Sequence, residues 1–155
     1  MSEMPKPTEA HQKLKRLAGV WEGKEMLSPS PWGPGGEATG KYTGRIDLDG
    51  FFLIQDYVEE KDGKVAFRGH GIFGWDPGDQ KFTWYWVDSM GGVPSAPSRG
   101  EWNGDTLTFE SSSPQGKGRY TYRFEGDSAY NFRLENSFDG GKTFTLLMEG
   151  TYHRK

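Results

Sequence analysis

The sequence predicts an all-β domain, a closed antiparallel up-and-down barrel of about ten strands with one short N-terminal helix. Aromatic and charged side chains alternate over several segments near the C-terminus, which is typical of strands with one buried face. The 23 glycines and 9 prolines separate short segments throughout the chain. Because each strand has an apolar face that one small helix cannot cover, the sheet is expected to close on itself.

Composition indicates a folded domain with an aromatic core. Aromatic residues make up 15% of the chain, and each can bury a large area. The 19 basic and 22 acidic residues leave no basic excess, so we expect no nucleic-acid partner. With no cysteine and three scattered histidines, we expect no metal site and no cofactor.

The beginning of the chain divides into an arm and a helix. Residues 1–7 contain two prolines and no periodicity, so they are expected to form a flexible arm before a single barrel domain at 8–155. Thr8 can cap a short helix that ends at Ala18-Gly19. The N-terminus lacks the apolar run of a signal peptide, and no segment is apolar enough to span a bilayer. We therefore expect a cytoplasmic protein without a membrane partner.

Turn signals divide the rest of the chain into strands. Asp62-Gly63 predicts a hairpin between Phe51–Glu60 and Lys64–Trp75. Two longer loops are predicted at Ser28–Gly36 and Ser89–Ser98, and on a rigid barrel such loops often surround a binding site.

The predicted inner face has many aromatic side chains with polar tips. A purely structural core would favour Leu, Ile and Val, so we expect a hollow interior that a ligand completes, although large aromatics could also fill it. On the last strand, the inward positions are expected to be Phe144, Leu146, Met148, Gly150 and Tyr152. The predicted ligand-binding residues are Tyr42, Trp84, Trp86, Asp88, Tyr120, Tyr122, Tyr130, Met148 and Tyr152.

Asp88 is the candidate catalytic residue. A carboxylate at the end of the row formed by Phe82, Trp84 and Trp86 would be desolvated and suited to general acid–base chemistry. The alternative is that Asp88 caps the turn that follows its strand. His70 shares the parity of Arg68 and is expected to face solvent.

The chain resembles a bacterial family catalogued as domain of unknown function 1579. The resemblance extends from His11 to Arg154. Its motifs are His11-Gln12-x-Leu14-x-x-Leu17-Ala18-Gly19-x-Trp21-x-Gly23, Leu48-Asp49-Gly50-Phe51, Gly74-x-Asp76-Pro77 and Gly150-Thr151-Tyr152-x-Arg154.

The opening Gly19-x-Trp21 is also similar to that of the lipocalin-like, or calycin, barrels. This resemblance implies that a helical turn plugs one end of the barrel and that Trp21 has a structural role at its base. The nitrobindin-type haem barrels share the Gly-x-Trp-x-Gly opening, and their haem is held by an inward histidine on the last strand. Here His153 is out of phase with the inward positions, so no haem is expected.

Three functions are compatible with these features. The preferred one is non-enzymatic binding of a small apolar or aromatic molecule, which enters between the two long loops. The second is an isomerase- or cyclase-type enzyme that uses Asp88. The third is an interaction or dimerisation module with a filled barrel, for which a homodimer is the simplest assembly.

Overall fold

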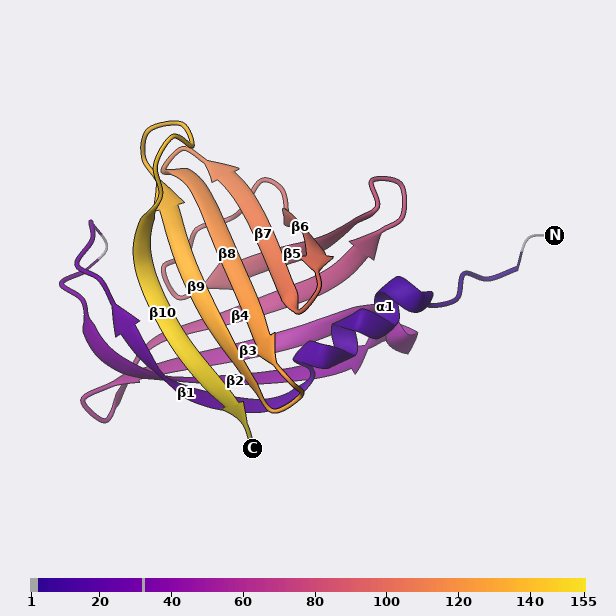
Figure 1. Cartoon of the computed structure of the whole chain (residues 1–155), viewed down its shortest axis with the longest axis horizontal. Coiled ribbons are helices and arrows are strands. Elements are labelled where there is room, and N and C mark those ends of the chain that lie inside the picture. The colour runs from indigo at the N-terminus through magenta and orange to yellow at the C-terminus, as the bar shows by residue number, and fades with distance from the viewer. Residues whose placement is uncertain (1–2, 32) are drawn as a thin grey trace.

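The computed structural model describes residues 3–31 and 33–155, and in these ranges ten antiparallel strands form a closed barrel (Figure 1). Each strand pairs with its neighbours in sequence, and β1 pairs with β10 to close the sheet. Strands account for 64% of the residues, which confirms the predicted fold class. The elements are α1 (Glu9–Lys13), η1 (Leu14–Leu17), β1 (Gly19–Leu27), β2 (Gly36–Asp47), η2 (Leu48–Gly50), β3 (Phe52–Lys61), β4 (Lys64–Asp76), β5 (Lys81–Asp88), β6 (Ser98–Asn103), β7 (Thr106–Ser113), β8 (Gly116–Glu125), β9 (Ala129–Ser137) and β10 (Thr145–Arg154).

The N-terminal helix covers one end of the barrel. Thr8 precedes α1 and shares a capping box with His11, and the helix continues as the single turn η1. Leu14 and Leu17 are buried against the barrel. Of the predicted flexible arm, residues 3–7 have no regular secondary structure, and residues 1–2 lie outside the described ranges.

Turn chemistry and a β-bulge together set the register of the central strands. Asp62 and Gly63 both have positive φ, 52° and 76°, as a two-residue hairpin turn requires. The hairpin joins β3 to β4, as predicted, and a bulge between Glu59 and Glu60 then shifts the register by one residue, so that Gln55 lies opposite Gly71 on the inner face. Residue 32 of the predicted Ser28–Gly36 loop lies outside the described ranges.

The predicted inward row of β10 is wrong in its first half. A β-bulge lies between Leu146 and Met148, where the register with β9 shifts. Leu146 is paired with Glu135 and therefore shares the outer face, whereas Met148, Gly150 and Tyr152 face inward as predicted. A bulge adds one residue to a strand, so it reverses the parity of everything before it.

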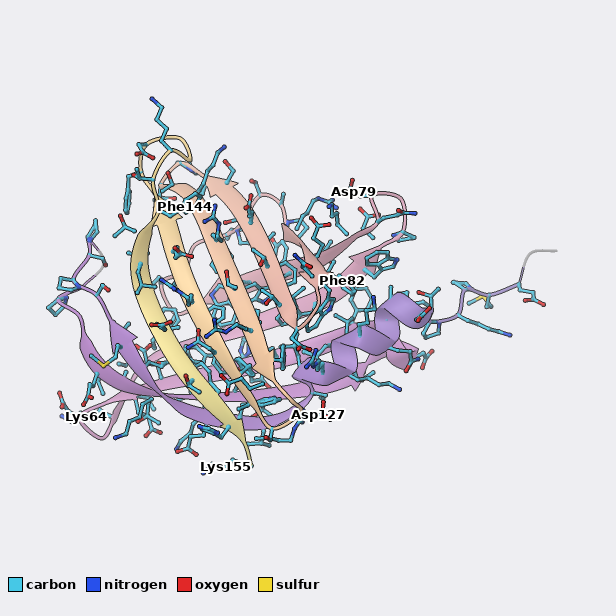
Figure 2. The ribbon with its side chains drawn as sticks, viewed as in Figure 1. Lys64, Asp79, Phe82, Asp127, Phe144 and Lys155 are labelled. Atoms are coloured by element: carbon cyan, nitrogen blue, oxygen red, sulfur yellow. The ribbon has the colours of Figure 1, made fainter. Side chains whose placement is uncertain are left out.

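Phe144 lies before the bulge and also points away from the interior. The Arg119 guanidinium lies 3.8 Å from the centre of its ring. Arg119 belongs to the outer face, where it pairs with Glu110 at 3.7 Å. Figure 2 shows Phe144 at the end of the barrel away from α1.

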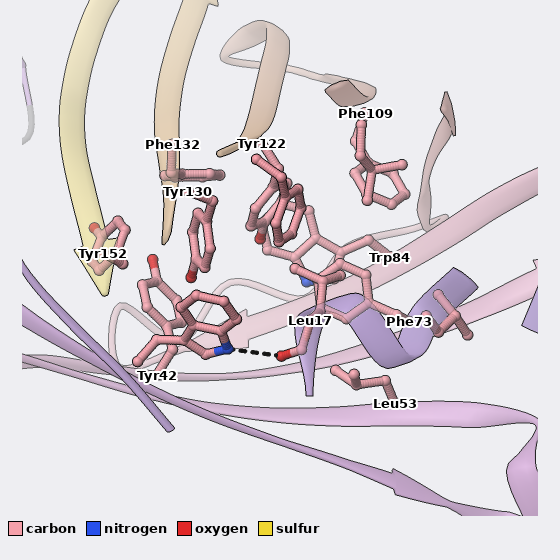
Figure 3. Packing of buried hydrophobic residues seen from close by; sticks show 14 of the residues in the cluster. Leu17, Tyr42, Leu53, Phe73, Trp84, Phe109, Tyr122, Tyr130, Phe132 and Tyr152 are labelled. Carbon is pink, nitrogen blue, oxygen red and sulfur yellow. Dashed lines mark hydrogen bonds between the residues drawn. The ribbon is translucent and has the colours of Figure 1, made fainter. Parts of the chain in front are cut away.

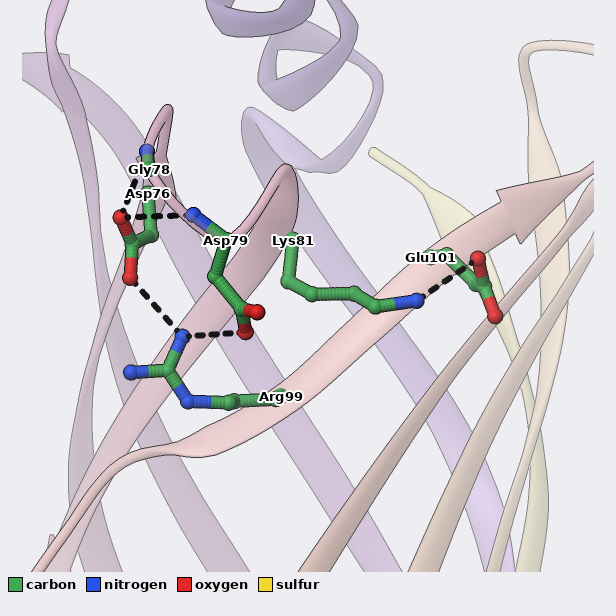
Figure 4. Close-up of polar contacts among 6 residues, drawn as sticks. All are labelled: Asp76, Gly78, Asp79, Lys81, Arg99 and Glu101. Carbon is green, nitrogen blue, oxygen red and sulfur yellow. Dashed lines mark hydrogen bonds and ion pairs between the residues drawn. The ribbon is translucent and has the colours of Figure 1, made fainter.

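The outer face is polar. Arg99 bridges Asp76 and Asp79 at 2.9 and 3.0 Å, and Lys81 pairs with Glu101 at 3.0 Å (Figure 4). These pairs are solvent-exposed, so water screens them and each contributes little to stability. Their charged side chains lie outside the barrel.

Candidate functional site

The two ends of the barrel interior differ in how closely they are packed. Trp21, 1% exposed, lies at the helix end, where its indole N–H donates to the Leu17 carbonyl at 3.1 Å. Its ring makes an edge contact with Tyr130 at 4.8 Å. The Arg154 guanidinium covers the ring at 4.2 Å. Trp21 is therefore buried at the base of the first strand, as its predicted structural role requires.

The opposite, open end is bounded by the last residues of β1, β3, β5, β7 and β9 (Figure 1). Here several inner-face side chains are only partly buried while they pack against the core. They are Phe67, Trp86, Tyr120 and Leu134. Solvent therefore reaches an aromatic inner surface at this end, below the predicted Ser28–Gly36 and Ser89–Ser98 loops.

Inward glycines make room for these large rings on the barrel wall. A methyl group added to Gly69 would lie 2.1 Å from the Trp86 ring. One added to Gly118 would lie 2.6 Å from the Tyr120 hydroxyl. Such distances are well inside van der Waals contact, so each glycine allows its neighbouring ring to lie close to the backbone.

The predicted ligand-binding residues are all on the inner face, and the structure brings most of them together (Figure 3). Trp86, Tyr120 and Asp88 are half-buried towards the open end. The fully buried members are Tyr42, Trp84, Tyr122, Tyr130, Met148 and Tyr152.

Ring contacts fill the middle of the interior. Trp84 stacks on Phe73 at 5.1 Å with an interplanar angle of 10° and makes an edge contact with Tyr122 at 5.8 Å. Tyr42 stacks on Tyr57 at 4.3 Å. Side chains therefore fill the middle of the lumen, as the alternative of a filled barrel expects, and the inner surface that stays partly exposed lies at the open end.

Two depressions lie elsewhere on the molecule. One, of about 690 Å³, is at the helix end and is lined partly by Arg16, Trp102 and Arg154. The other, of about 830 Å³, lies on the outer face of β1 and β10. Neither is lined by a predicted ligand-binding residue.

Asp88 has the hydrogen bonds of a strand-end cap. Its carboxylate accepts from the Trp86 indole N–H at 2.8 Å and from the Met90 backbone N–H at 2.9 Å. Its carbonyl also accepts from the Gly91 N–H at 3.0 Å. These contacts match the capping alternative and fix the Trp86 ring at the open end.

The carboxyl group best placed for acid–base chemistry is that of Glu25, which the sequence analysis missed. Glu25 is 0% exposed on the inner face of β1. The Tyr57 hydroxyl lies 2.7 Å from both of its oxygens, and the Tyr152 hydroxyl donates to Oε2. The Tyr57 hydroxyl also lies 2.8 Å from Glu59 Oε2. One phenolic hydrogen cannot serve two carboxylates at once, so a carboxyl group must hold a second proton.

Burial is the main reason that this proton stays on Glu25. Desolvation raises the pKa of Glu25 to about 8, hydrogen bonds from Tyr152 and Tyr57 lower it, and the neighbouring Glu59 raises it. Within the described part of the chain, no basic side chain pairs with either carboxyl group. Glu25 is therefore a neutral acid near pH 7 in a cluster with Tyr57, Glu59 and Tyr152.

Strand parity contained a signal for Glu25. Residues 21, 23 and 25 alternate along one strand, and the first of these is the buried Trp21, so residue 25 must face the same way. Glu59 has the same relation to Leu53 and Tyr57 on β3, where apolar residues on both faces obscured the pattern.

His70 and His153 lie on the outer face of the barrel. His70 is exposed and its Nδ1 lies 2.7 Å from Asp56 Oδ1 on the outer face, and His153 is exposed on β10. Across residues 3–31 and 33–155, no three acidic or histidine side chains are grouped so as to hold a metal ion. All helical segments in these ranges are short, and none has the length and apolar character of a bilayer-spanning helix.

The protein is a closed ten-stranded antiparallel barrel. It is defined by the pairing order of its strands, the aromatic rows that face inward and the helix that covers one end. More particularly, the chain belongs to the family described as "Protein of unknown function (DUF1579)", whose model matches residues 6–154. The resemblance to this family that the sequence indicated is thereby confirmed. Among curated proteins, none matches the sequence.

Solved structures share the fold at low sequence identity. The crystal structure of Rv2717c from M. tuberculosis has a TM-score of 0.69 and 15% identity, over 96% of this chain and 98% of that one. The S-type phycobiliprotein lyase CPES from Guillardia theta has a TM-score of 0.68 and 9% identity, over 96% and 93% of the two chains. A redesigned β-barrel has a TM-score of 0.50 and 14% identity, over 97% and 99%. At these identities the likeness concerns the barrel alone.

Proposed function

We propose that the protein binds a small apolar or aromatic molecule at the open end of its barrel. One observation carries the proposal: Phe67, Trp86, Tyr120 and Leu134 form an inner surface that the fold leaves partly exposed to solvent. Concave sites lined by aromatic side chains with a few polar groups are the usual form of a small-molecule site. That a phycobiliprotein lyase shares the barrel is compatible with such a role.

Intrinsic tryptophan fluorescence tests this proposal, because Trp86 lies in the proposed site. A panel of aromatic fragments and fatty acids is titrated into the wild-type protein and into Trp86→Phe. The matched control is Trp75→Phe, which removes a half-buried tryptophan beside Phe82, away from the proposed site. A ligand at the open end changes the emission of the wild type and of Trp75→Phe, whereas the response is much reduced in Trp86→Phe. The proposal fails if no member of the panel changes the emission or if the response depends on Trp75 instead.

The Glu25 cluster favours catalysis as a second candidate function. A desolvated carboxyl group that holds a proton near neutral pH is suited to general acid–base steps of the isomerase or cyclase type. Compounds that bind in the first experiment are incubated with the wild type and with Glu25→Gln, and the products are analysed by mass spectrometry. Conversion by the wild type alone supports an enzyme, and its absence leaves binding as the function.

The third candidate, an interaction or dimerisation module, is favoured by the ring contacts that fill the middle of the barrel. Native mass spectrometry of the purified protein separates it from the other two, since it reports assembly state and co-purifying small molecules together. A homodimer without a bound small molecule supports this module.

A further inference from the structure

The depression at the helix end of the barrel carries positive charge. It lies between η1, the β6–β7 turn and the β8–β9 turn, and its volume is about 690 Å³. Among the described residues, its charged lining consists of four basic side chains and one acidic side chain, which are Lys13, Lys15, Arg16, Arg154 and Asp127. The whole chain, in contrast, has a net charge of −3. The depression therefore concentrates positive charge on a protein that is slightly acidic.

Arg154 is held in place without a counter-charge. Its Nε donates to the Asp127 carbonyl at 2.8 Å, its Nη1 donates to the Ala18 carbonyl, and its Nη2 donates to the Arg16 carbonyl at 3.4 Å. Backbone carbonyls orient a guanidinium but do not neutralise it, and no ion pair among the described residues involves Arg154. A guanidinium has more donors than these bonds use, so N–H groups remain for a ligand.

Arg16, unlike Arg154, has a carboxylate partner. Its guanidinium pairs with Asp105 at 3.0 Å. It also lies 4.7 Å from the centre of the Phe124 ring and 5.5 Å from that of the Trp102 ring. Because the charge of Asp105 formally cancels that of Arg16, this pair is a fixed part of the wall that adds no net charge to the depression.

Lys13 and Lys15 supply the remaining positive charge. Both are exposed, and neither has an ion pair among the described residues. Asp127 also has no ion pair in the same part of the chain. With Arg16 neutralised, the three remaining basic groups exceed this one carboxylate by two charges. A group with two negative charges would therefore balance the depression.

Charge and donor geometry favour a phosphate group over other small anions. A phosphate ester carries a charge of about −1.5 to −2 at pH 7, which matches the excess, whereas a carboxylate carries only a single negative charge. Guanidinium groups bind phosphate oxygens through paired N–H donors, and lysine ammonium groups act beside them as point charges. The volume of about 690 Å³ also leaves room for the organic body of a small molecule.

We propose that the depression at the helix end binds the phosphate group of a small phosphorylated molecule through Arg154, Lys13 and Lys15. This site lies at the end of the barrel opposite the proposed apolar site. The two proposals therefore rest on different residues, and the failure of one leaves the other standing.

Isothermal titration calorimetry in a phosphate-free buffer tests the site with three matched probes: glycerol 3-phosphate, glycerate and glycerol. They share a short polar body that does not suit the apolar site at the open end, and they differ in the charged group. We expect glycerol 3-phosphate to bind at least about tenfold more tightly than glycerate, as one additional charge-assisted hydrogen bond allows, and glycerol not to bind. The proposal is wrong if glycerol 3-phosphate does not bind or binds no more tightly than glycerate.

Two double variants locate the bound phosphate. Lys13→Gln combined with Lys15→Gln removes both lysines from the depression and should weaken the binding of glycerol 3-phosphate at least about tenfold. The matched control is Lys117→Gln combined with Lys142→Gln, which removes the same charge from exposed positions at the open end. This control should bind glycerol 3-phosphate as tightly as the wild type. Equal losses in the two double variants would mean that only the net charge of the protein matters, and they overturn the proposed site.

A single substitution in the opposite sense guards against loss of binding through misfolding. Asp127→Asn removes the acidic charge from the depression but keeps the backbone carbonyl that orients Arg154. It should tighten the binding of glycerol 3-phosphate by about two- to fivefold, as the removal of one exposed like charge allows. An unchanged or weaker affinity in this variant contradicts the proposal.

Discussion

Replacing Glu25 by glutamine should change the pH dependence of stability in a defined direction. The folded protein holds a proton on Glu25 up to a pKa of about 8, whereas the ordinary value is 4.5. Because the pKa of Glu25 is higher in the folded than in the unfolded protein, the free energy of unfolding is highest below pH 4.5, where Glu25 is protonated in both states. The free energy of unfolding then falls as the pH rises from 4.5 to about 8 and is level above that, because the unfolded chain releases the proton first.

The size of the effect follows from the pKa difference. One pKa unit corresponds to about 1.4 kcal/mol, so the contrast between low and high pH amounts to about 5 kcal/mol at most. Glutamine keeps an oxygen that accepts from Tyr57 and Tyr152 but cannot ionise. Glu25→Gln should therefore match the wild type near pH 5 and exceed it by several kcal/mol near pH 9.

Urea unfolding of both proteins at intervals from pH 4.5 to 9 measures this difference directly. Glu22→Gln is the matched control, because Glu22 lies on the same strand, faces outward and pairs with Lys155 at 3.6 Å. That exposed pair should be worth less than about 1 kcal/mol at every pH. The difference in the free energy of unfolding between the wild type and Glu25→Gln should therefore depend on pH. If it is the same at pH 9 as at pH 5, the argument that Glu25 is protonated and desolvated is refuted.

The remaining predictions concern the core and haem. Trp21→Ala should lower the free energy of unfolding by about 3–5 kcal/mol in urea titrations, the usual effect of truncating a buried aromatic, and a loss below about 1 kcal/mol would contradict its burial. Ferric haem should give no stoichiometric Soret shift, since no histidine faces inward on β10, and a shift that His153→Ala abolishes would disprove the parity of that strand.

Most of the fold was predictable because its signals are local. The Asp62-Gly63 turn, the aromatic and charged alternation of β8 and β9, and the capped N-terminal helix each depend on a few adjacent residues. Closure of the sheet into a barrel was predictable because each strand has an apolar face that must be buried and the one small helix cannot cover them all. The alternation breaks at Leu147, but the sequence alone did not show that β9 and β10 change register there, so the parity of Leu146 and Phe144 was predicted wrongly.

The candidate site was predictable only in part. Parity placed Trp84, Tyr122 and Tyr152 on the inner face, and the structure agrees. The sequence indicated Asp88 as the candidate catalytic carboxylate, and Glu25 was missed. In the structure Asp88 lies at the end of its strand and accepts a hydrogen bond from Trp86, two residues before it. The partners of Glu25 are Tyr57 and Tyr152, which are 32 and 127 residues away, so its environment could not be seen along the chain.

The sequence by itself determined that this protein is a ten-stranded barrel with an aromatic inner face, because alternation, turns and caps depend on short-range stereochemistry. Only the tertiary structure decided which polar atoms are paired and which are not. Glu25 gains two tyrosine hydroxyls across the barrel, while the buried indole N–H groups of Trp84 and Trp102 have no partner among the described residues. The reason is that hydrogen bonding and desolvation depend on the distance between side chains from different strands, and closure of the barrel sets those distances.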